Sequence, residues 1–296
     1  MLGRVTFGDR YSELRGLAFG VAYRLLGTAR DAEDVVQDAF LRLQEAPAPE
    51  AVRDPEAYLV TVTTRVAIDQ LRSARVRRES YVGSWLPEPL LTGPEPADTA
   101  VRSDSLSTAV LLLLETLTPV ERAVFVLREA FGYDYDEIAA IVGKSAVNCR
   151  QVFARANRRV ADGRPRFETS PAERRRLVGE LLAACERGDL DGLVDLLSED
   201  VAFHGDGGGK VRALAHPVSG AAATARLLLT YHRNTVERGD TVAVVDFGYQ
   251  PGLLVTGADG TPVGAVAFAC DAQVREIHSV VNPDKLTALA EPVAVA

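Results

Sequence analysis

Long apolar runs, cysteine and secretion signals are scarce in this sequence of 296 residues. No apolar run approaches the roughly 20 residues that a membrane-spanning helix needs, and the start, MLGRVTFGDRYSEL, lacks the charged and then apolar layout of a signal peptide. The three cysteines, Cys149, Cys185 and Cys270, match neither a metal-ligand spacing nor a disulfide framework. We therefore expect a cytoplasmic protein with reduced thiols, and no membrane segment, metal or cofactor.

Basic residues are also few relative to acids, 33 to 41, and the net charge of −8 argues at first against a nucleic-acid partner. The charge is segregated, however. Residues 64–78 hold five arginines against one aspartate, and residues 144–166 hold seven basic residues against one acid. Residues 31–38 hold four acids and no base. Two basic stretches and one acidic stretch indicate separate surfaces for different partners.

Residues 117–160 have the pattern of three helices in close succession. Thr118 can cap the first helix, and Pro119 suits its first turn. A short helix, roughly residues 135–141, is followed by Gly143, which gives the backbone freedom that a tight corner between helices needs. The third helix opens at Ser145. We expect it to turn four side chains inward: Val147, Val152, Phe153 and Ala156.

The other face of this third helix is rich in side chains that reach bases or phosphates in a major groove. They are Ser145, Asn148, Arg150, Gln151, Arg155, Arg158 and Arg159. The pattern is typical of a helix-turn-helix, and the alternative is an ordinary helical hairpin with a solvated basic face. We expect the residues near the helix start to meet base edges, and the late pair Arg158 and Arg159 to hold phosphates.

The N-terminal part predicts three more helices. Residues 9–44 indicate two helices joined near Gly27, the second with acids in its first turns, where the helix dipole favours them. A further helix begins after Asp54-Pro55 and runs over residues 56–78. It ends in clustered arginine, which is usually a solvated helix end but is also suited to phosphates.

Residues 80–100 contain SWLPEPLLTGPEP, with four prolines from Pro87 to Pro96. Proline fixes φ and removes a hydrogen-bond donor, so this segment is expected to be a semi-extended linker. It nevertheless carries Trp85, the only tryptophan of the chain. Because an unpacked linker has little use for an indole ring, we expect Trp85 to dock on another part of the protein.

The chain changes character from Pro171 onward. Helices are expected at 172–187, 191–197 and 219–232, and strands at 201–204, 210–213, 241–247, 252–256, 263–269 and 274–280. Helices with a curved antiparallel sheet predict an α+β fold with a cone-shaped pocket. Four residues of this part could serve as acid–base groups: His204, Asp206, His216 and Asp246. Their spacing does not force them together, and we expect no enzymatic activity.

In the order and spacing of these motifs, residues 7–162 resemble an extracytoplasmic-function (group IV) sigma factor of bacterial RNA polymerase. DAEDVVQDAFLRL at 31–43 resembles region 2.2, DPEAYLVTVTTRVAIDQLRSARVRR at 54–78 resembles regions 2.3 and 2.4, and the helix-turn-helix resembles region 4.2. The resemblance implies that these regions bind the core polymerase, melt and read the −10 element, and read the −35 element. Tyr58 and Arg65 stand where many members carry Trp and Asn, which leaves the −10 preference open.

The resemblance assigns site residues to the RNA polymerase core and to promoter DNA. Core-polymerase contacts are expected at Asp31, Glu33, Asp34, Gln37, Asp38 and Phe40. Contacts with melted DNA at the −10 element are expected at Tyr58, Arg65, Arg72, Arg75, Arg77 and Arg78. Contacts with double-stranded DNA at the −35 element are expected at the seven residues named for the third helix. Tyr58 can stack on a base or be buried, and both alternatives stay open.

The remainder of the chain is similar to a SnoaL-like domain of the NTF2 superfamily. Together, WLPEP at 85–89, DGGGK at 206–210 and NPDKL at 282–286 resemble the SigJ-type subgroup, in which the extension regulates the sigma module where a separate anti-sigma factor would otherwise act. The resemblance implies an intramolecular contact of the C-terminal domain with sigma region 2 or the linker. Its expected residues are Trp85, Leu86, Pro87, Asn282, Pro283, Asp284 and Lys285.

The predicted domains are sigma region 2 at 1–79, a linker at 80–101, sigma region 4 at 102–163, a linker at 164–171 and the SnoaL-like domain at 172–296. The predicted function is a promoter-recognising initiation factor regulated in cis. The alternative is a helix-turn-helix regulator with a ligand-sensing NTF2-like domain, which would need neither the acidic helix nor the arginine helix. An enzyme of the polyketide-cyclase line would leave most of the motifs unexplained.

Overall fold

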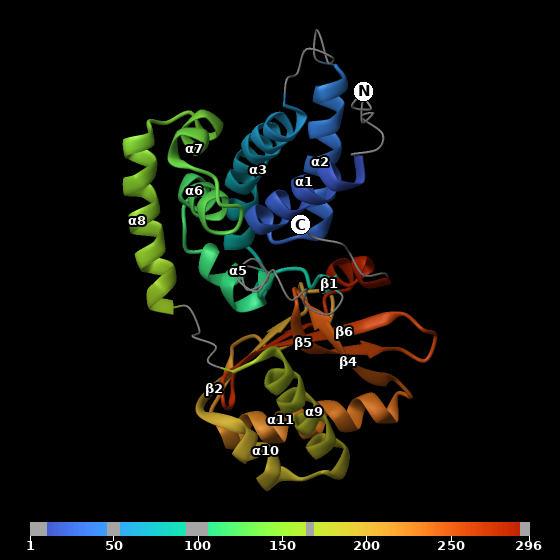
Figure 1. Ribbon diagram of the computed structural model, residues 1–296. Helices are drawn as coiled ribbons and strands as arrows, with labels where there is room; N and C mark the ends of the chain where they lie inside the picture. Colours follow the sequence, from blue (N-terminus) through green and yellow to red (C-terminus); the bar gives the residue numbers. More distant parts are fainter. Residues whose placement is uncertain (1–10, 46–53, 93–105, 164–168, 291–296) are drawn as a thin grey trace, which may run out of the picture. The chain divides into compact units, whose positions relative to one another are not determined.

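The computed structural model describes residues 11–45, 54–92, 106–163 and 169–290 (Figure 1). These residues form two compact units. The first comprises the described residues of Met1–Arg77 and Leu113–Asp162, and the second those of Arg78–Leu112 and Gly163–Val293. None of the helices in the described ranges is long and apolar enough to span a membrane.

The first unit begins with three helices, α1 (Tyr11–Leu26), α2 (Ala29–Gln44) and α3 (Pro55–Glu79). Their apolar positions recur every three or four residues and are buried, among them Phe19, Leu25, Val35 and Leu59. Gly27, between α1 and α2, has a φ of 74°, a left-handed conformation that costs glycine little. The predicted helices and the corner at Gly27 are confirmed.

Four further helices follow along the chain: α5 (Thr108–Leu114), most of which belongs to the second unit, and α6 (Pro119–Glu129), α7 (Tyr135–Val142) and α8 (Ala146–Gly163) of the first unit. Both α6 and α7 begin with a capping box, formed in α6 by Thr118 and Glu121. Gly143 ends α7 in the left-handed conformation, with a φ of 66°. These local signals explain why the three helices from α6 to α8 follow the predicted boundaries closely.

One side chain of α8 lies opposite to its predicted place. The buried stripe of α8 consists of Cys149, Val152, Ala156 and Val160, whereas Val147, predicted to point inward, is 61% exposed. The stripe residues lie three or four apart and share one face of the helix. Val147 lies two residues before Cys149, which places it about 200° around the helix axis. The inward prediction for Val147 was therefore wrong.

Within the first unit, α6 packs against α1. The buried Arg122 of α6 donates from Nε to the backbone carbonyl oxygen of Arg24 in α1, at 2.9 Å, and forms an ion pair with Glu115. The guanidinium group of Arg24 lies over the ring of Phe131, 5.0 Å from its centroid. A buried guanidinium is costly without partners, so these contacts favour one arrangement of α6 on α1.

The second unit is an α+β domain in which helices α9 (Pro171–Arg187), α10 (Leu190–Leu196) and α11 (Ala221–Glu237) lie along a seven-stranded sheet (Figure 1). The strands are β1 (Leu91–Thr92), β2 (Leu197–Asp206), β3 (Val218–Ser219), β4 (Thr241–Phe247), β5 (Gln250–Thr256), β6 (Pro262–Cys270) and β7 (Val274–Val280). Their order in the sheet is β1-β4-β5-β6-β7-β2-β3. Two 3-10 helices, η3 (Pro283–Lys285) and η4 (Thr287–Ala290), follow β7. The predicted fold class, helical modules followed by an α+β domain, is confirmed.

Three features of the sheet differ from the prediction. β2 pairs with β7 in parallel, so the sheet is mixed and not antiparallel; the two strands are far apart in sequence, and no hairpin turn dictates their direction. Residues 210–213 form no strand, because Gly208 and Gly209 take positive φ values and turn the chain just before them. The proline-rich linker supplies β1, which pairs antiparallel with β4.

Each face of the sheet has its own apolar cluster. Leu253 packs in the cluster that includes Phe203 and side chains of α9, α10 and α11. The adjacent position Leu254 belongs to the other cluster, with Val280 and Leu86. Since side chains alternate along a strand, the two clusters lie on opposite faces. The linker, through Leu86, thus contributes to the core of the second unit.

Candidate functional site

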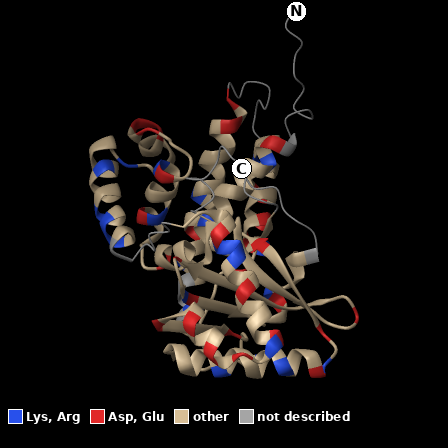
Figure 2. Ribbon diagram, turned by 60° about the horizontal axis from the view of Figure 1, so that its bottom comes forward, with Lys and Arg blue, Asp and Glu red and all other residues tan. Residues whose placement is uncertain are grey.

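The exposed face of α8 carries the predicted −35 residues. All seven side chains are exposed, and the arginines of this helix are drawn in blue in Figure 2. Some also have local partners. The Oγ of Ser145 accepts from the backbone N–H of Asn148 at 3.2 Å and caps the helix, the guanidinium of Arg150 lies 5.2 Å from the ring centroid of Tyr135, and Arg159 pairs with Glu121 at 3.2 Å. Exposed contacts of this kind are weak, so they can yield to a stronger partner such as a phosphate.

The predicted −10 residues lie along α3. The half-buried Tyr58 donates from its hydroxyl to a backbone carbonyl of α2 at 3.3 Å, so its ring is neither fully buried nor free. Arg72 is exposed and pairs with Asp69 at 2.7 Å, one turn earlier in α3. The side chains of Arg75 and Arg77 lie outside the described residues, so their roles stay predictions.

Arg65 has partners in the helix-turn-helix. Its Nε donates to the backbone carbonyl oxygen of Ile141 at 2.9 Å, and a terminal guanidinium nitrogen donates to that of Ala140 at 2.9 Å. These carbonyls belong to the last turn of α7, where carbonyl groups lack partners within the helix and the helix dipole favours a cation. In this arrangement the Arg65 guanidinium stabilises the end of α7.

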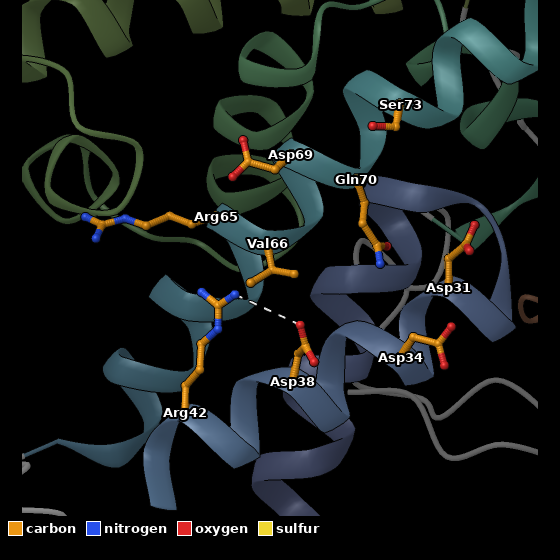
Figure 3. A pocket seen from close by; sticks show the side chains of 9 residues that line it. All are labelled: Asp31, Asp34, Asp38, Arg42, Arg65, Val66, Asp69, Gln70 and Ser73. Atoms are coloured by element: carbon orange, nitrogen blue, oxygen red, sulfur yellow. Dashed lines mark ion pairs between the residues drawn. The ribbon is translucent and has the colours of Figure 1, made fainter. Parts of the chain in front are cut away.

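A groove of about 590 Å³ separates α2 from α3 (Figure 3). Its lining residues are Asp31, Asp34, Asp38, Arg42, Arg65, Val66, Asp69, Gln70 and Ser73. Three of its four acids come from α2, and the fourth comes from α3. The structure therefore gathers three of the four predicted polymerase-facing acids of α2 along one groove.

Two predicted polymerase-facing residues of α2 are engaged elsewhere. Glu33 pairs with Arg15 of α1 at 2.6 Å. Phe40 is only 6% exposed and lies in the core, so it supports α2 from within and offers little surface. Leu41, which the sequence did not single out, is 46% exposed on the same helix.

In the second unit, three sequence motifs meet at Asp206, which is fully buried. Its carboxylate accepts from the Tyr81 hydroxyl at 2.6 Å, from the Leu86 backbone N–H at 2.9 Å and from Lys285 Nζ at 2.7 Å. The Asn282 side-chain amide donates to the Tyr81 hydroxyl at 2.9 Å. We call Tyr81, Leu86, Asp206, Asn282 and Lys285 the Asp206 cluster. It joins the linker, the DGGGK segment and the NPDKL segment.

The ring of Trp85 lies beside this cluster. The guanidinium carbon of Arg78 lies 3.7 Å from its centroid, and the Nζ of Lys285 lies 4.5 Å from it. Cations over an indole ring are attracted to its electron-rich face. At the surface of the same region, Lys210 and Asp284 form an ion pair at 2.5 Å. Trp85 is therefore packed within the second unit, as its presence in a linker led us to expect.

Burial shifts the pKa values of two groups in the cluster, Lys285 and Tyr81. Burial lowers the pKa of Lys285, and the Asp206 carboxylate acts in the opposite direction by favouring the ammonium form. Burial and the hydrogen bond to Asp206 raise the pKa of Tyr81, so its hydroxyl stays protonated and keeps donating to the carboxylate. The charged pair and its donors together satisfy groups that would be costly to bury alone.

Close approach explains a glycine of the DGGGK segment. Gly208 has a φ of 60°, and its backbone N–H donates to the Asp206 carboxylate at 3.0 Å. A β-carbon at this position would lie 2.3 Å from the Asn282 side-chain nitrogen. The segment therefore needs glycine both for its backbone conformation and for the contact with the NPDKL segment.

The four candidate acid–base residues do not converge. Asp206 is held in its cluster, Asp246 pairs with Arg175 of α9 at 2.7 Å, and His216 is exposed in a loop. His204 stacks on His278 at 5.4 Å between ring centroids, and burial together with His278 lowers the pKa of His204. The described residues contain no group of three or more His, Cys, Asp and Glu side chains arranged to hold a metal ion.

Sequence reasoning missed two members of this region, Tyr81 and Arg78. Arg78 was assigned to DNA alone, although here it lies over Trp85. Tyr81 carried no motif, and its position four residues before Trp85 was the only available signal. The partners of Tyr81, Asp206 and Asn282, are distant in sequence, whereas Arg78 and Trp85 are only seven residues apart.

Comparisons with known proteins identify both helical modules. Residues 10–77 match the family model Sigma-70 region 2, and residues 107–160 match the model Sigma-70, region 4. The chain is 37% identical to the ECF RNA polymerase sigma factor SigJ of Mycobacterium tuberculosis (strain ATCC 25618 / H37Rv), over 94% of this chain and 93% of the relative. It is 33% identical to the probable ECF RNA polymerase sigma factor SigI of the same strain, over 93% of each chain.

The similarity extends to three-dimensional structure. The crystal structure of the Mycobacterium tuberculosis extracytoplasmic function sigma factor SigJ superposes with a TM-score of 0.74 and 33% sequence identity. The match covers 95% of this chain and 98% of that one, so it includes the α+β domain as well as the helical modules. With this full-length similarity and both sigma-70 regions in place, the chain belongs to the family of extracytoplasmic-function RNA polymerase sigma factors.

Proposed function

We propose that this sigma factor binds core RNA polymerase through α2, directs promoter-specific initiation through α3 and α8, and is regulated in cis by its C-terminal domain through the linker. The observation that carries the regulatory part is the Asp206 cluster. There the linker contributes Tyr81 and Leu86, and the C-terminal domain contributes Asp206 and Lys285. We place this activity in the cytoplasm, where RNA polymerase works.

The linker is a suitable point of control because it connects the two promoter-reading modules. The reach of a linker depends on how much of its length is free to extend. Residues of the linker are tied to the C-terminal domain by the Asp206 cluster and by β1, which pairs with β4. Since both parts belong to one chain, even a modest contact benefits from a high effective concentration. Whether the linker is bound to the C-terminal domain or released from it would then determine how freely sigma regions 2 and 4 can bind the −10 and −35 elements.

The proposed domains follow the sequence boundaries given above, with one exception taken from the compact units. Residues 80–92 of the linker and residues 106–112 are proposed to act as part of the C-terminal regulatory body. Trp85, Leu86, Pro87, Asn282, Pro283, Asp284 and Lys285 are the proposed regulatory contact. The seven residues of α8 are proposed for the −35 element, and the arginines of α3 with Tyr58 for the −10 element.

Run-off transcription with purified core polymerase tests the proposal. Three chains are compared: the full-length protein, one ending near Arg164 and one ending just before Asn282. Trp85→Ala in the full-length chain loosens the contact without burying a charge, and Val236→Ala on α11 serves as a surface control. Two differences in the amount of promoter-specific transcript would support regulation in cis. The first is a difference between the full-length protein and the truncated chains, and the second is a difference between Trp85→Ala and Val236→Ala.

Each part of the proposal has its own contrary result. Greater activity of the truncated chains identifies the C-terminal domain as a brake, and lower activity identifies it as a support for the sigma modules. Equal transcript from all chains contradicts regulation in cis. Absence of transcript from every chain, with an active core enzyme, contradicts initiation and favours a helix-turn-helix regulator with a ligand-sensing domain.

Reversing two acids of α2 tests the polymerase contact. We expect Asp34→Lys with Asp38→Lys to weaken binding to core polymerase about tenfold or more, because charges that attract the partner become like charges. Both side chains are exposed, so the fold should persist. Binding is measured by fluorescence anisotropy of labelled protein titrated with core enzyme.

The matched control reverses Asp191 and Asp195, two exposed acids that are also four residues apart on a helix, α10. This control changes the net charge equally but lies outside α2. Two results would show that the α2 acids are not the polymerase contact. One is that the α2 variant binds core polymerase as tightly as the native chain, and the other is that the α2 variant and the control lose equal affinity.

A further inference from the structure

Val147 is an apolar side chain on the exposed face of the recognition helix. It is the second residue of α8 and is 61% exposed, the position for which the sequence had predicted burial. The residues around it on this face are polar or charged. Gln151 lies one turn later on the same line of the helix, and Arg150 and Asn148 flank that line.

Its position is also the one that meets bases in helix-turn-helix proteins. The N-terminal residues of a recognition helix approach the base edges, and later residues approach the backbone. Val147 is opposite the buried stripe of Cys149, Val152 and Ala156, so it points in the direction in which DNA would lie if α8 enters the major groove. A valine has no hydrogen-bonding group to offer to a base or a phosphate.

The edge of a base pair in the major groove has one apolar feature, the C5-methyl group of thymine. Contact with that methyl removes apolar surface from water on both sides. We propose that Val147 is a specificity-determining residue that recognises the thymine methyl group in the −35 element. The proposal rests on the proposed function, in which α8 reads that element. Arg150, Gln151 and Asn148 would supply the hydrogen bonds, and Val147 would select thymine by shape and apolar contact.

A single-methyl experiment tests this directly. Holoenzyme is assembled from core polymerase and the full-length chain, and its preferred promoter duplex is obtained by selection from a random library. Each thymine of the −35 element is then replaced in turn by deoxyuridine, which lacks only the methyl group and pairs in the same way. We expect one such replacement to weaken binding by the native chain about fourfold, the effect of one buried methyl-sized group.

The variant Val147→Ala should lose affinity for the thymine duplex and become insensitive to the replacement at that position. Val236→Ala, at an equally exposed valine on α11, should behave as the native chain. Native affinity that is unchanged on every deoxyuridine duplex overturns the proposal. So does a Val147→Ala variant that still loses about fourfold on the same replacement.

Failure of the proposed function would look different. If α8 does not read the −35 element, the native holoenzyme will bind a duplex with a scrambled −35 element as tightly as the selected one. If α8 does read it and only the role of Val147 is wrong, the preference over the scrambled duplex remains and only the methyl effect is missing.

Discussion

Replacing Lys285 by methionine is expected to lower the free energy of unfolding of the second unit by about 3–5 kcal/mol, the cost of leaving a buried carboxylate without its charged partner. Asp206 is fully buried, and Lys285 is 7% exposed, so water cannot take the place of the lost ammonium group. The hydroxyl of Tyr81 and the backbone N–H of Leu86 would remain, but neither carries a positive charge. Methionine keeps most of the length and apolar character of the lysine stem, so the change isolates the charge.

Unfolding by urea, followed through Trp85 fluorescence, measures the effect. Trp85 is the only tryptophan, and its ring lies under the charge that is removed. Lys210→Met is the matched control, because Lys210 also pairs with an aspartate but has 54% of its side chain exposed. The control should cost less than about 1 kcal/mol. Equal losses in the two variants would contradict a structural role for the buried pair.

The double variant Asp206→Asn with Lys285→Met gives a second check. It removes both charges, so it should be less destabilised than Lys285→Met alone. A double variant that is as unstable as the sum of the two single variants would show that the two residues act independently. In transcription, Lys285→Met should shift activity in the same direction as the removal of the C-terminal domain, since both release the linker.

The second large effect is expected at the start of the recognition helix. Arg150→Ala together with Gln151→Ala should lower the preference for the native −35 element over a scrambled one by roughly 10- to 100-fold, because a good bidentate contact to a base contributes about 1–3 kcal/mol of discrimination. Both side chains are exposed, and the stripe of buried residues that holds α8 in place is untouched. Competition binding of holoenzyme to the two duplexes measures the preference.

Arg158→Ala distinguishes base reading from phosphate binding. Arg158 lies late in α8 and is expected to meet a phosphate, so its loss should weaken binding to both duplexes alike and reduce the salt dependence. Arg226→Ala on α11 removes the same charge from an exposed helix position in the other unit and should have little effect. If the Arg150 and Gln151 variant lost affinity equally on native and scrambled duplexes, these residues would not be reading sequence.

The sequence alone determined the helical modules and the likeness to sigma factors. Helices are specified by neighbours a few residues apart, through apolar spacing, capping residues and glycine corners, and all of these can be read along the chain. Thr118 with Glu121 starts α6, and Gly143 ends α7. The acids of α2 and the basic residues of α8 could also be predicted from the sequence, because a charged side chain at the surface is solvated by water and needs no partner from elsewhere in the chain.

Tertiary structure decided the rest. The Asp206 cluster joins residues that are 79 to 201 positions apart, and no local pattern specifies that Tyr81 or Lys285 should meet Asp206. The parallel pairing of β2 with β7 and the contact of Arg65 with α7 are equally remote in sequence. The prediction for Val147 was wrong because an apolar side chain suggests burial, whereas its actual exposure depends on which face of α8 is buried. That face carries Cys149, and Val147 lies on the opposite side of the helix. A buried charge is stable only where the fold places a partner of opposite charge beside it. The position of such a pair therefore follows from the tertiary structure and cannot be predicted from local sequence.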